Sequence, residues 1–222
     1  MTPPVTRSAR GSEVVAAGRR LLEEEGVEAL TMRRLADRVG IRAPSLYKHL
    51  PDKAALEAAI IATGLEDAAA AFEAAVDGVG DGRSGAARDG EAEGRGEAGA
   101  QHPGSGPTTS GAAAAGAGGD GAGMGGGGGL AALAAAYRRF ALEHPHLYRL
   151  MHNGPLPREH LPPGLEERTA APVLRVAGSQ ARARAVWAFA HGMVMLELDH
   201  RFPPDADLDA AWQAGIAAFQ RS

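Results

Sequence analysis

The stretch from Thr31 to Leu50, TMRRLADRVGIRAPSLYKHL, constrains the fold more than any other part of the chain. Its first half places Leu35, Ala36 and Val39 on one helical face. Gly40 follows at a position where a helix typically ends in a left-handed residue, which glycine adopts without a steric cost. The small side chain of Ala36 lets a second helix cross closely. The pattern predicts a short helix that ends at a tight turn.

A second helix is predicted directly after this turn. Pro44 suits its first turn, because the fixed φ of proline is already helical and its missing N–H costs nothing there. Leu46 and Leu50, four residues apart, form the inner face of this helix. Its outer face carries the polar side chains Ser45, Tyr47, Lys48 and His49. This arrangement is a helix-turn-helix, whose second helix is the kind that lies in the major groove of DNA.

Ten residues in and beside this stretch are candidates for DNA contact. They are Thr31, Arg33, Arg42, Ala43, Pro44, Ser45, Tyr47, Lys48, His49 and Lys53. Thr31, Arg33 and Lys53 stand at the starts of predicted helices, where free N–H groups and the helix dipole attract phosphate. Ala43 and Pro44 allow close approach to the duplex. The alternative is that Tyr47 belongs partly to the core and that the polar residues are solvated surface.

Charge divides the chain into a basic front and an acidic rear. The net charge of −4 combines +3 over residues 1–53, with ten Lys and Arg against seven Asp and Glu, and −7 over residues 54–222, with thirteen against twenty. Only the front is therefore expected to meet a polyanion. The chain has no cysteine, no signal-peptide pattern and no apolar run of membrane-spanning length, so we expect a cytoplasmic protein.

Helices are predicted for the rest of the chain, before and after one stretch of unusual composition. Residues 78–129 hold 21 of the 31 glycines and almost no large apolar side chain, so they are predicted to be disordered. Helical periodicity resumes at Leu130, and no strand pattern is convincing. The prediction is an all-α protein with a three-helix DNA-binding domain at 12–53 and a C-terminal helical bundle for effector binding and dimerisation at 54–222, interrupted by this insertion.

Residues 12–61 resemble the DNA-binding domain of the TetR family of bacterial repressors. The resemblance rests on Gly26, Thr31, Leu35, Ala36, Gly40, Ser45, Leu46, Tyr47, His49, Lys53 and Leu56. It implies a homodimer that binds a palindromic operator through two heads and dimerises through its last two helices. It also implies a small-molecule pocket in each rear domain, whose unidentified effector releases the DNA. Trp187, His191 and Gly192 resemble the WHG-type subgroup of the family.

The apolar helix faces and this resemblance predict two functional sets of residues in the C-terminal domain. The candidate effector pocket contains Phe140, Tyr148, Met151, Trp187, His191 and Met195. The candidate dimer interface contains Val194, Leu198, Trp212, Ile216 and Phe219. For both sets the alternative is ordinary core packing within one chain. Four histidines lie in or near loops without a helical pair, so no metal site and no cofactor are expected: His144, His146, His152 and His160.

We therefore expect a ligand-responsive transcriptional repressor. One alternative is a DNA-architectural or protein-binding module without sequence preference, with the Gly-rich stretch as its interaction tail. The other is an enzyme that uses the rear pocket. No enzyme is expected, because the chain has no nucleophile elbow, no cofactor fingerprint and no arguable pair of carboxylates.

Overall fold

The computed structural model describes residues 9–88 and 126–221, and over these residues the chain is helical without strands. The predicted all-α class is confirmed. In chain order the elements are α1 (Ala9–Glu25), η1 (Val27–Ala29), α2 (Met32–Val39), α3 (Ala43–Leu46), α4 (Lys53–Arg88), α5 (Gly126–Glu143), α6 (Pro145–His152), η2 (Arg158–His160), α7 (Leu165–Ala177), α8 (Gln180–Leu198) and α9 (Leu208–Arg221).

Local capping chemistry sets the bounds of α2. The Thr31 hydroxyl accepts a hydrogen bond from the Arg34 backbone N–H at 3.3 Å, which satisfies one free donor at the start of the helix. Gly40 ends the helix at φ +69°, and the Ile41 N–H then donates to the Ala36 carbonyl at 3.0 Å. Both predicted caps are confirmed.

The second helix of the helix-turn-helix, α3, is shorter than the sequence predicts. The regular part of α3 is the single turn Ala43–Leu46, and the next three residues form a hydrogen-bonded turn. Pro51 disfavours a helical Leu50, which limits how far the helix can extend. The Leu50 N–H still donates to the Leu46 carbonyl at 3.0 Å, so the inner face is kept and both leucines are buried.

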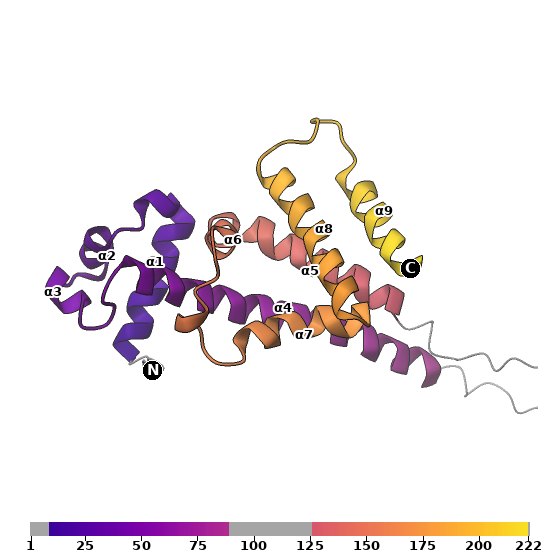
Figure 1. The fold of residues 1–222 in the computed structure, drawn as a ribbon, viewed down its shortest axis with the longest axis horizontal. Coiled ribbons are helices and arrows are strands. Elements are labelled where there is room, and N and C mark those ends of the chain that lie inside the picture. Colours follow the sequence, from indigo (N-terminus) through magenta and orange to yellow (C-terminus); the bar gives the residue numbers. More distant parts are fainter. Residues whose placement is uncertain (1–8, 89–125, 222) are drawn as a thin grey trace, which may run out of the picture.

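We call α1, η1, α2 and α3 the head, and α5 to α9 the rear bundle. The long helix α4 runs from the head into the rear bundle (Figure 1). Asp52 caps it by accepting a hydrogen bond from the Ala55 N–H at 2.7 Å. Leu56 and Ile60 are fully buried and pack beside Gly18 of α1, where a Cβ would lie 3.0 Å from a Leu56 methyl carbon. The head core therefore includes the first turns of α4 and extends past residue 53, where the sequence placed the domain boundary.

The ends of the Gly-rich stretch are helical. Residues 78–88 continue α4, and residues 126–129 open α5. Both ends adjoin long, Ala-rich helices, and extending an existing helix costs far less than nucleating one. The prediction of disorder for the central part, residues 89–125, lies outside the described residues.

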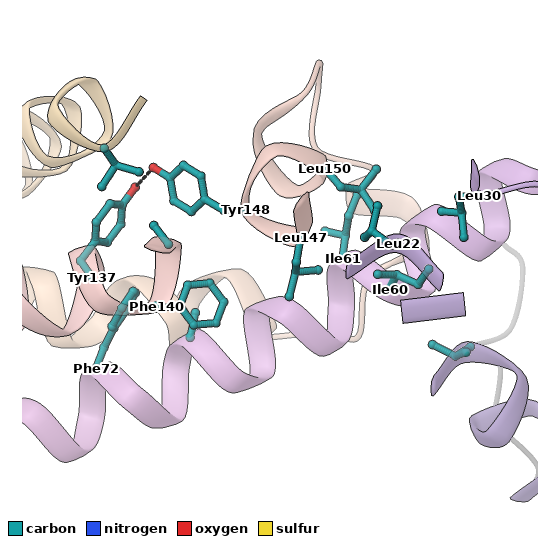
Figure 2. Close-up of a cluster of buried hydrophobic side chains, with 14 of the residues drawn as sticks. Leu22, Leu30, Ile60, Ile61, Phe72, Tyr137, Phe140, Leu147, Tyr148 and Leu150 are labelled. Atoms are coloured by element: carbon teal, nitrogen blue, oxygen red, sulfur yellow. Dashed lines mark hydrogen bonds between the residues drawn. The ribbon is translucent and has the colours of Figure 1, made fainter. Parts of the chain in front are cut away.

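One apolar core joins the head to the rear bundle. Figure 2 shows it running from Leu22 and Leu30 through Leu147 to the ring of Phe72. Gly64 of α4 is a point of close approach, because a Cβ there would lie 2.6 Å from the sulfur of Met151 and 3.1 Å from a Leu147 methyl carbon. The absence of a side chain at this position lets α6 lie directly on α4.

Arg138 of α5 ties the last two helices to the bundle. Its Nε donates to a Glu197 oxygen at 3.0 Å and its Nη2 to the other at 2.7 Å, while its Nη1 donates to Asp209 at 2.5 Å. The guanidinium also lies over the ring of Trp212. Hydrogen bonds to these two carboxylates raise the pKa of Arg138, so it stays charged and cross-links α5, α8 and α9.

Candidate functional site

The outer face of the helix-turn-helix presents polar side chains on a buried apolar support. Ser45 and Lys48 are exposed, and Tyr47 is 50% exposed although it is a large aromatic residue. His49 is half-buried. Leu46 anchors this segment from below at 0% exposure. An exposed tyrosine beside an exposed lysine, held by a rigid core, can contact a flat, charged partner such as the edge of a DNA groove.

Salt bridges divide the arginines and lysines of the head into two groups. Arg34 pairs with Glu25 of α1, and Arg38 pairs with Glu24 and Glu25, so these two arginines fasten α2 to α1. Over the described residues, by contrast, no carboxylate forms a salt bridge with the exposed Arg33, Arg42 or Lys48. Their charge is available to an outside anion.

The remaining predicted DNA contacts occupy helix starts around this face. The exposed Thr31 already uses its hydroxyl as the cap of α2. Ala43 is the first residue of α3, and Pro44 is exposed beside it. Lys53 is the first residue of α4 and lies 3.4 Å from Glu57, one helical turn away. All ten predicted residues thus fall within one contiguous part of the head.

A chain of hydrogen bonds crosses the rear bundle. The hydroxyls of Tyr137 and Tyr148 are 2.8 Å apart (Figure 2), and the Tyr148 hydroxyl lies 2.7 Å from Nδ1 of His191. Burial raises the pKa of Tyr137 to about 12 and raises that of Tyr148 further, so both hydroxyls stay protonated. The chain joins α5, α6 and α8 through groups that can donate and accept.

Aromatic rings continue this chain toward the surface. The rings of His152 and His191 stack with centroids 4.7 Å apart, and the rings of Trp187 and His191 stack with centroids 5.9 Å apart. Burial lowers the pKa of both histidines, so both are neutral at pH 7. Trp187 remains 49% exposed, which is unusual for so large an apolar side chain.

A surface hollow of about 330 Å³ opens beside the stacked histidines. It lies where the turn of the head meets α6 and α8, and its size is at the lower end of small-molecule sites. Its lining residues are Val27, His146, Arg149, Leu150, His152, Asn153, His191 and Met195. A similar hollow of about 300 Å³ lies at the head, lined by α1 residues and His144.

The structure brings together only part of the predicted effector pocket. His191 and Met195 line the hollow, while Tyr148 and Trp187 contact His191 without lining it. Phe140 lies elsewhere, buried against Phe72 and His144. Met151 packs on Gly64 of α4.

Four polar residues that line the hollow are absent from the predicted set. His146, Arg149, His152 and Asn153 lie three to four residues apart or adjacent along α6 and its end, so they share one helical face. That spacing was present in the sequence. Polar residues at this spacing usually face solvent, and only the tertiary fold places them against α8.

Most of the predicted dimer residues are used inside the chain. Val194, Trp212 and Ile216 are 0–6% exposed within a single protomer, which leaves them almost no surface for a second copy. Leu198 and Phe219 are half-buried against the same core. Apolar periodicity identified the buried faces of α8 and α9 correctly, but α8 packs on α5 and α7, and α9 packs on α5 and α8 of the same chain.

The four histidines considered for metal binding do not form one cluster, although His146 and His152 of α6 line the same hollow. His144 lies 3.1 Å from Glu23, His160 lies 3.1 Å from Glu159, and Nδ1 of His152 lies 2.8 Å from the Tyr148 carbonyl. Among the described residues, no three His, Cys, Asp or Glu side chains come together as a metal ion requires. In the same part of the chain, no helix has the length and apolarity to cross a bilayer.

The described residues combine a helix-turn-helix, a motif of DNA-binding proteins, with a helical rear bundle. Residues 14–60 match a family model described as "Bacterial regulatory proteins, tetR family", and residues 130–219 match one described as "Tetracyclin repressor-like, C-terminal domain". The chain belongs to the TetR family. The WHG-type subgroup stays a prediction, with Trp187, His191 and Gly192 all on α8.

Known relatives agree with this assignment. The chain is 49% identical over 43 residues to the tetracycline repressor protein class G of Vibrio anguillarum, and equally to the class A protein from transposon 1721 of Escherichia coli. These matches span 19% of this chain and 20% of each relative.

Solved structures share the fold over nearly the whole chain. A protein of unknown function from Rhodococcus sp. RHA1 matches with a TM-score of 0.62 at 23% identity, covering 99% of this chain and 98% of its own. A TetR variant from Acinetobacter baumannii AYE in complex with minocycline matches with a TM-score of 0.55 at 20% identity, covering 95% and 93%.

Proposed function

We propose that this protein is a sequence-specific DNA-binding transcriptional regulator, a repressor that a small molecule releases from its operator. The observation that carries the proposal is the outer face of the helix-turn-helix. There Tyr47 and Lys48 are exposed on a buried leucine support, flanked by arginines that form no salt bridge with the described carboxylates. Membership in the TetR family supports the same reading.

The arginines and lysines of the head divide into DNA contacts and internal fasteners. Arg33, Arg42 and Lys48 are the proposed phosphate or base contacts, because their charges are not neutralised within the described chain. Arg38 is the matched opposite case, since its guanidinium is already bound by two carboxylates of α1. An arginine held in this way contributes little to DNA affinity.

The salt dependence of DNA binding separates these two groups. Each phosphate contact contributes a slope of about −0.9 to the dependence of log K on log salt. Arg42→Ala therefore lowers the magnitude of the slope by about 1 per head. Arg38→Ala removes the same charge but leaves the slope close to wild type. Fluorescence anisotropy with an operator duplex at several salt concentrations measures the slope of each variant. Equal slopes for the two variants would contradict the assignment of Arg42 as a DNA contact and Arg38 as an internal salt-bridge residue.

The proposed assembly is a homodimer through the outer faces of α8 and α9. With Val194, Trp212 and Ile216 buried in the protomer, the exposed faces carry small or apolar residues. On α8 and α9 these residues are Ala181, Ala185, Ala188, Leu196, Ala210, Ala214 and Ala218. Small side chains let helices pack closely, as a bundle formed by two copies requires. Two heads held in this way would reach half-sites about 34–36 Å apart.

Ala188→Glu is expected to convert the dimer to monomers. The carboxylate would be buried at the contact of two α8 helices, and like charges or unpaired charges there cost several kcal/mol, which corresponds to about 100-fold or more in the dissociation constant. Ala70→Glu, at an exposed position of α4, is the matched control and keeps the wild-type mass. Light scattering during size-exclusion chromatography gives the masses. A dimeric Ala188→Glu variant would place the interface elsewhere.

The effector is proposed to bind in the rear domain beside the stacked histidines. The hollow there is lined by His191 and Met195 of the predicted pocket, and by α6. A ligand changes DNA affinity only through its different affinities for the two head arrangements. The long helix α4 supports such coupling, since its N-terminal turns pack in the head and its later turns in the bundle.

A further inference from the structure

The hollow between the head turn, α6 and α8 has a distinct lining chemistry. Three of its eight residues are apolar: Val27, Leu150 and Met195. The other five all carry side-chain N–H donors or ring nitrogens: His146, Arg149, His152, Asn153 and His191. None of the eight is acidic. Arg149 and Asn153 offer N–H donors, whereas Nδ1 of His152 and Nδ1 of His191 are already bonded to Tyr148. With donors and no carboxylate among the lining residues, the hollow favours a ligand with negatively charged or acceptor oxygens.

Arg149 is held in position for such a ligand. Its Nη2 donates to the Leu198 carbonyl at 3.1 Å and to Asp199 at 2.6 Å. Both bonds use the same nitrogen, so they orient the guanidinium while its other N–H groups remain to meet a ligand. A pre-oriented guanidinium binds a carboxylate with two parallel hydrogen bonds at little entropic cost.

The two stacked histidines define the other side of the site. Burial lowers the pKa of His152 and His191, so at pH 7 they are flat, neutral rings. The Nδ1–H of His152 donates to the Tyr148 carbonyl, so this ring offers a ligand its flat face and no N–H donor. Arg149 is the one Lys or Arg among the lining residues, and Asp199 partly neutralises its charge. Unlike Arg38, which is bound by two carboxylates, it uses one nitrogen, Nη2, for its partners, so Nε and Nη1 remain for a ligand. Because Val27, Leu150 and Met195 also line the hollow, it suits a ligand with one carboxylate and a flat apolar body.

The site also touches the head directly. Val27 belongs to η1, the turn that leads into the Thr31 cap of α2. The ring of His146 packs on Gly26, 3.4 Å from where a Cβ would stand. A ligand in the hollow would contact the element that positions the helix-turn-helix, which gives it a second, shorter route to the head beside α4.

We infer that this hollow binds a small aromatic carboxylate, anchored by Arg149 and seated against Val27 and the stacked histidines. This inference rests on the proposed function, because a ligand here regulates DNA binding only if the protein is such a regulator. It adds the chemical class of the effector and the residue that anchors it. The ligand would contact four residues in addition to the predicted His191 and Met195: His146, Arg149, His152 and Asn153.

Binding of a matched pair of probes tests the inference. Naphthoate and naphthamide have the same flat body, and they differ in the charge of the group that would meet Arg149. Titration calorimetry on the full chain without DNA is expected to give naphthoate an affinity at least about tenfold higher than naphthamide, since a charge-assisted bidentate pair replaces neutral hydrogen bonds. Equal affinities, or no naphthoate binding at about 10 mM, would overturn the inference.

Three variants locate the binding. Arg149→Gln and Asn153→Glu are both expected to weaken naphthoate binding by about tenfold or more, the first by removing the charge and the second by adding a repelling carboxylate. Arg158→Gln is the matched control, because this arginine is exposed and pairs with Glu166 away from the hollow. Circular dichroism checks that each variant is folded. Unchanged binding in Arg149→Gln would contradict the assignment.

Operator binding, measured separately, keeps the two proposals apart. A protein that shifts operator DNA but does not bind naphthoate retains the proposed function and loses this inference. A protein that binds naphthoate through Arg149 but shifts no operator retains the ligand site and loses the proposed function.

Discussion

Tyr47→Ala abolishes the operator shift in a gel at protein concentrations where the wild type is fully bound. Tyr47 is 50% exposed on the outer face of the recognition segment, which comprises α3 and the turn at residues 47–49, and it adjoins the exposed Lys48. A side chain that contacts DNA directly contributes about 1–3 kcal/mol. The dimer loses this contribution in both heads, so affinity falls by about 30-fold or more.

Two controls make the Tyr47 result specific. Tyr47→Phe keeps the ring and loses only the hydroxyl, so it should retain part of the affinity. The melting temperature of Tyr47→Ala should stay near that of the wild type, because the side chain adds little to the core. A Tyr47→Ala protein that shifts the operator like the wild type would mean that the recognition segment is misassigned.

Leu147→Ala is expected to destabilise the whole described fold by about 2–5 kcal/mol. Leu147 has no exposed surface and lies where α6 meets α4, beside Gly64 (Figure 2). Truncation leaves a cavity at the centre of the core that joins the head to the bundle. Urea unfolding followed by circular dichroism, at a fixed protein concentration, measures the loss.

The matched control is Leu142→Ala on α5. Leu142 is 41% exposed, so the same change of chemistry removes much less buried surface and should cost well under half as much free energy. Because the core is continuous, head and bundle should unfold together in Leu147→Ala. A head that remains folded after the bundle has melted would contradict one shared core.

The head could be predicted from the sequence because its signals are local. The cap at Thr31, the left-handed Gly40 and the buried pair Leu46 and Leu50 each depend on a few neighbouring residues, and all three are confirmed. The length of α3 was overestimated, because the outward-facing residues continue a helical pattern up to Pro51 while the backbone already turns after Leu46.

The rear could be predicted only in part, because its function depends on contacts between distant helices. Periodicity placed Val194 and Trp212 on apolar faces, but it carries no information on whether a neighbour in the same chain or a second copy covers that face. Polar residues such as Arg149 and His152 read as surface until α8 lies beside them. The contact between this half-exposed polar face of α6 and α8 follows from tertiary structure alone.

The most direct test of sequence-specific DNA binding is selection of bound DNA from a random pool by the purified full chain. A dimer with two helix-turn-helix heads should enrich one palindrome whose half-sites are centred about 34–36 Å apart, or a multiple of that distance. Tyr47→Ala should enrich nothing under the same conditions. Recovery of unselected sequence, with wild type and variant binding alike, would contradict a sequence-specific regulator.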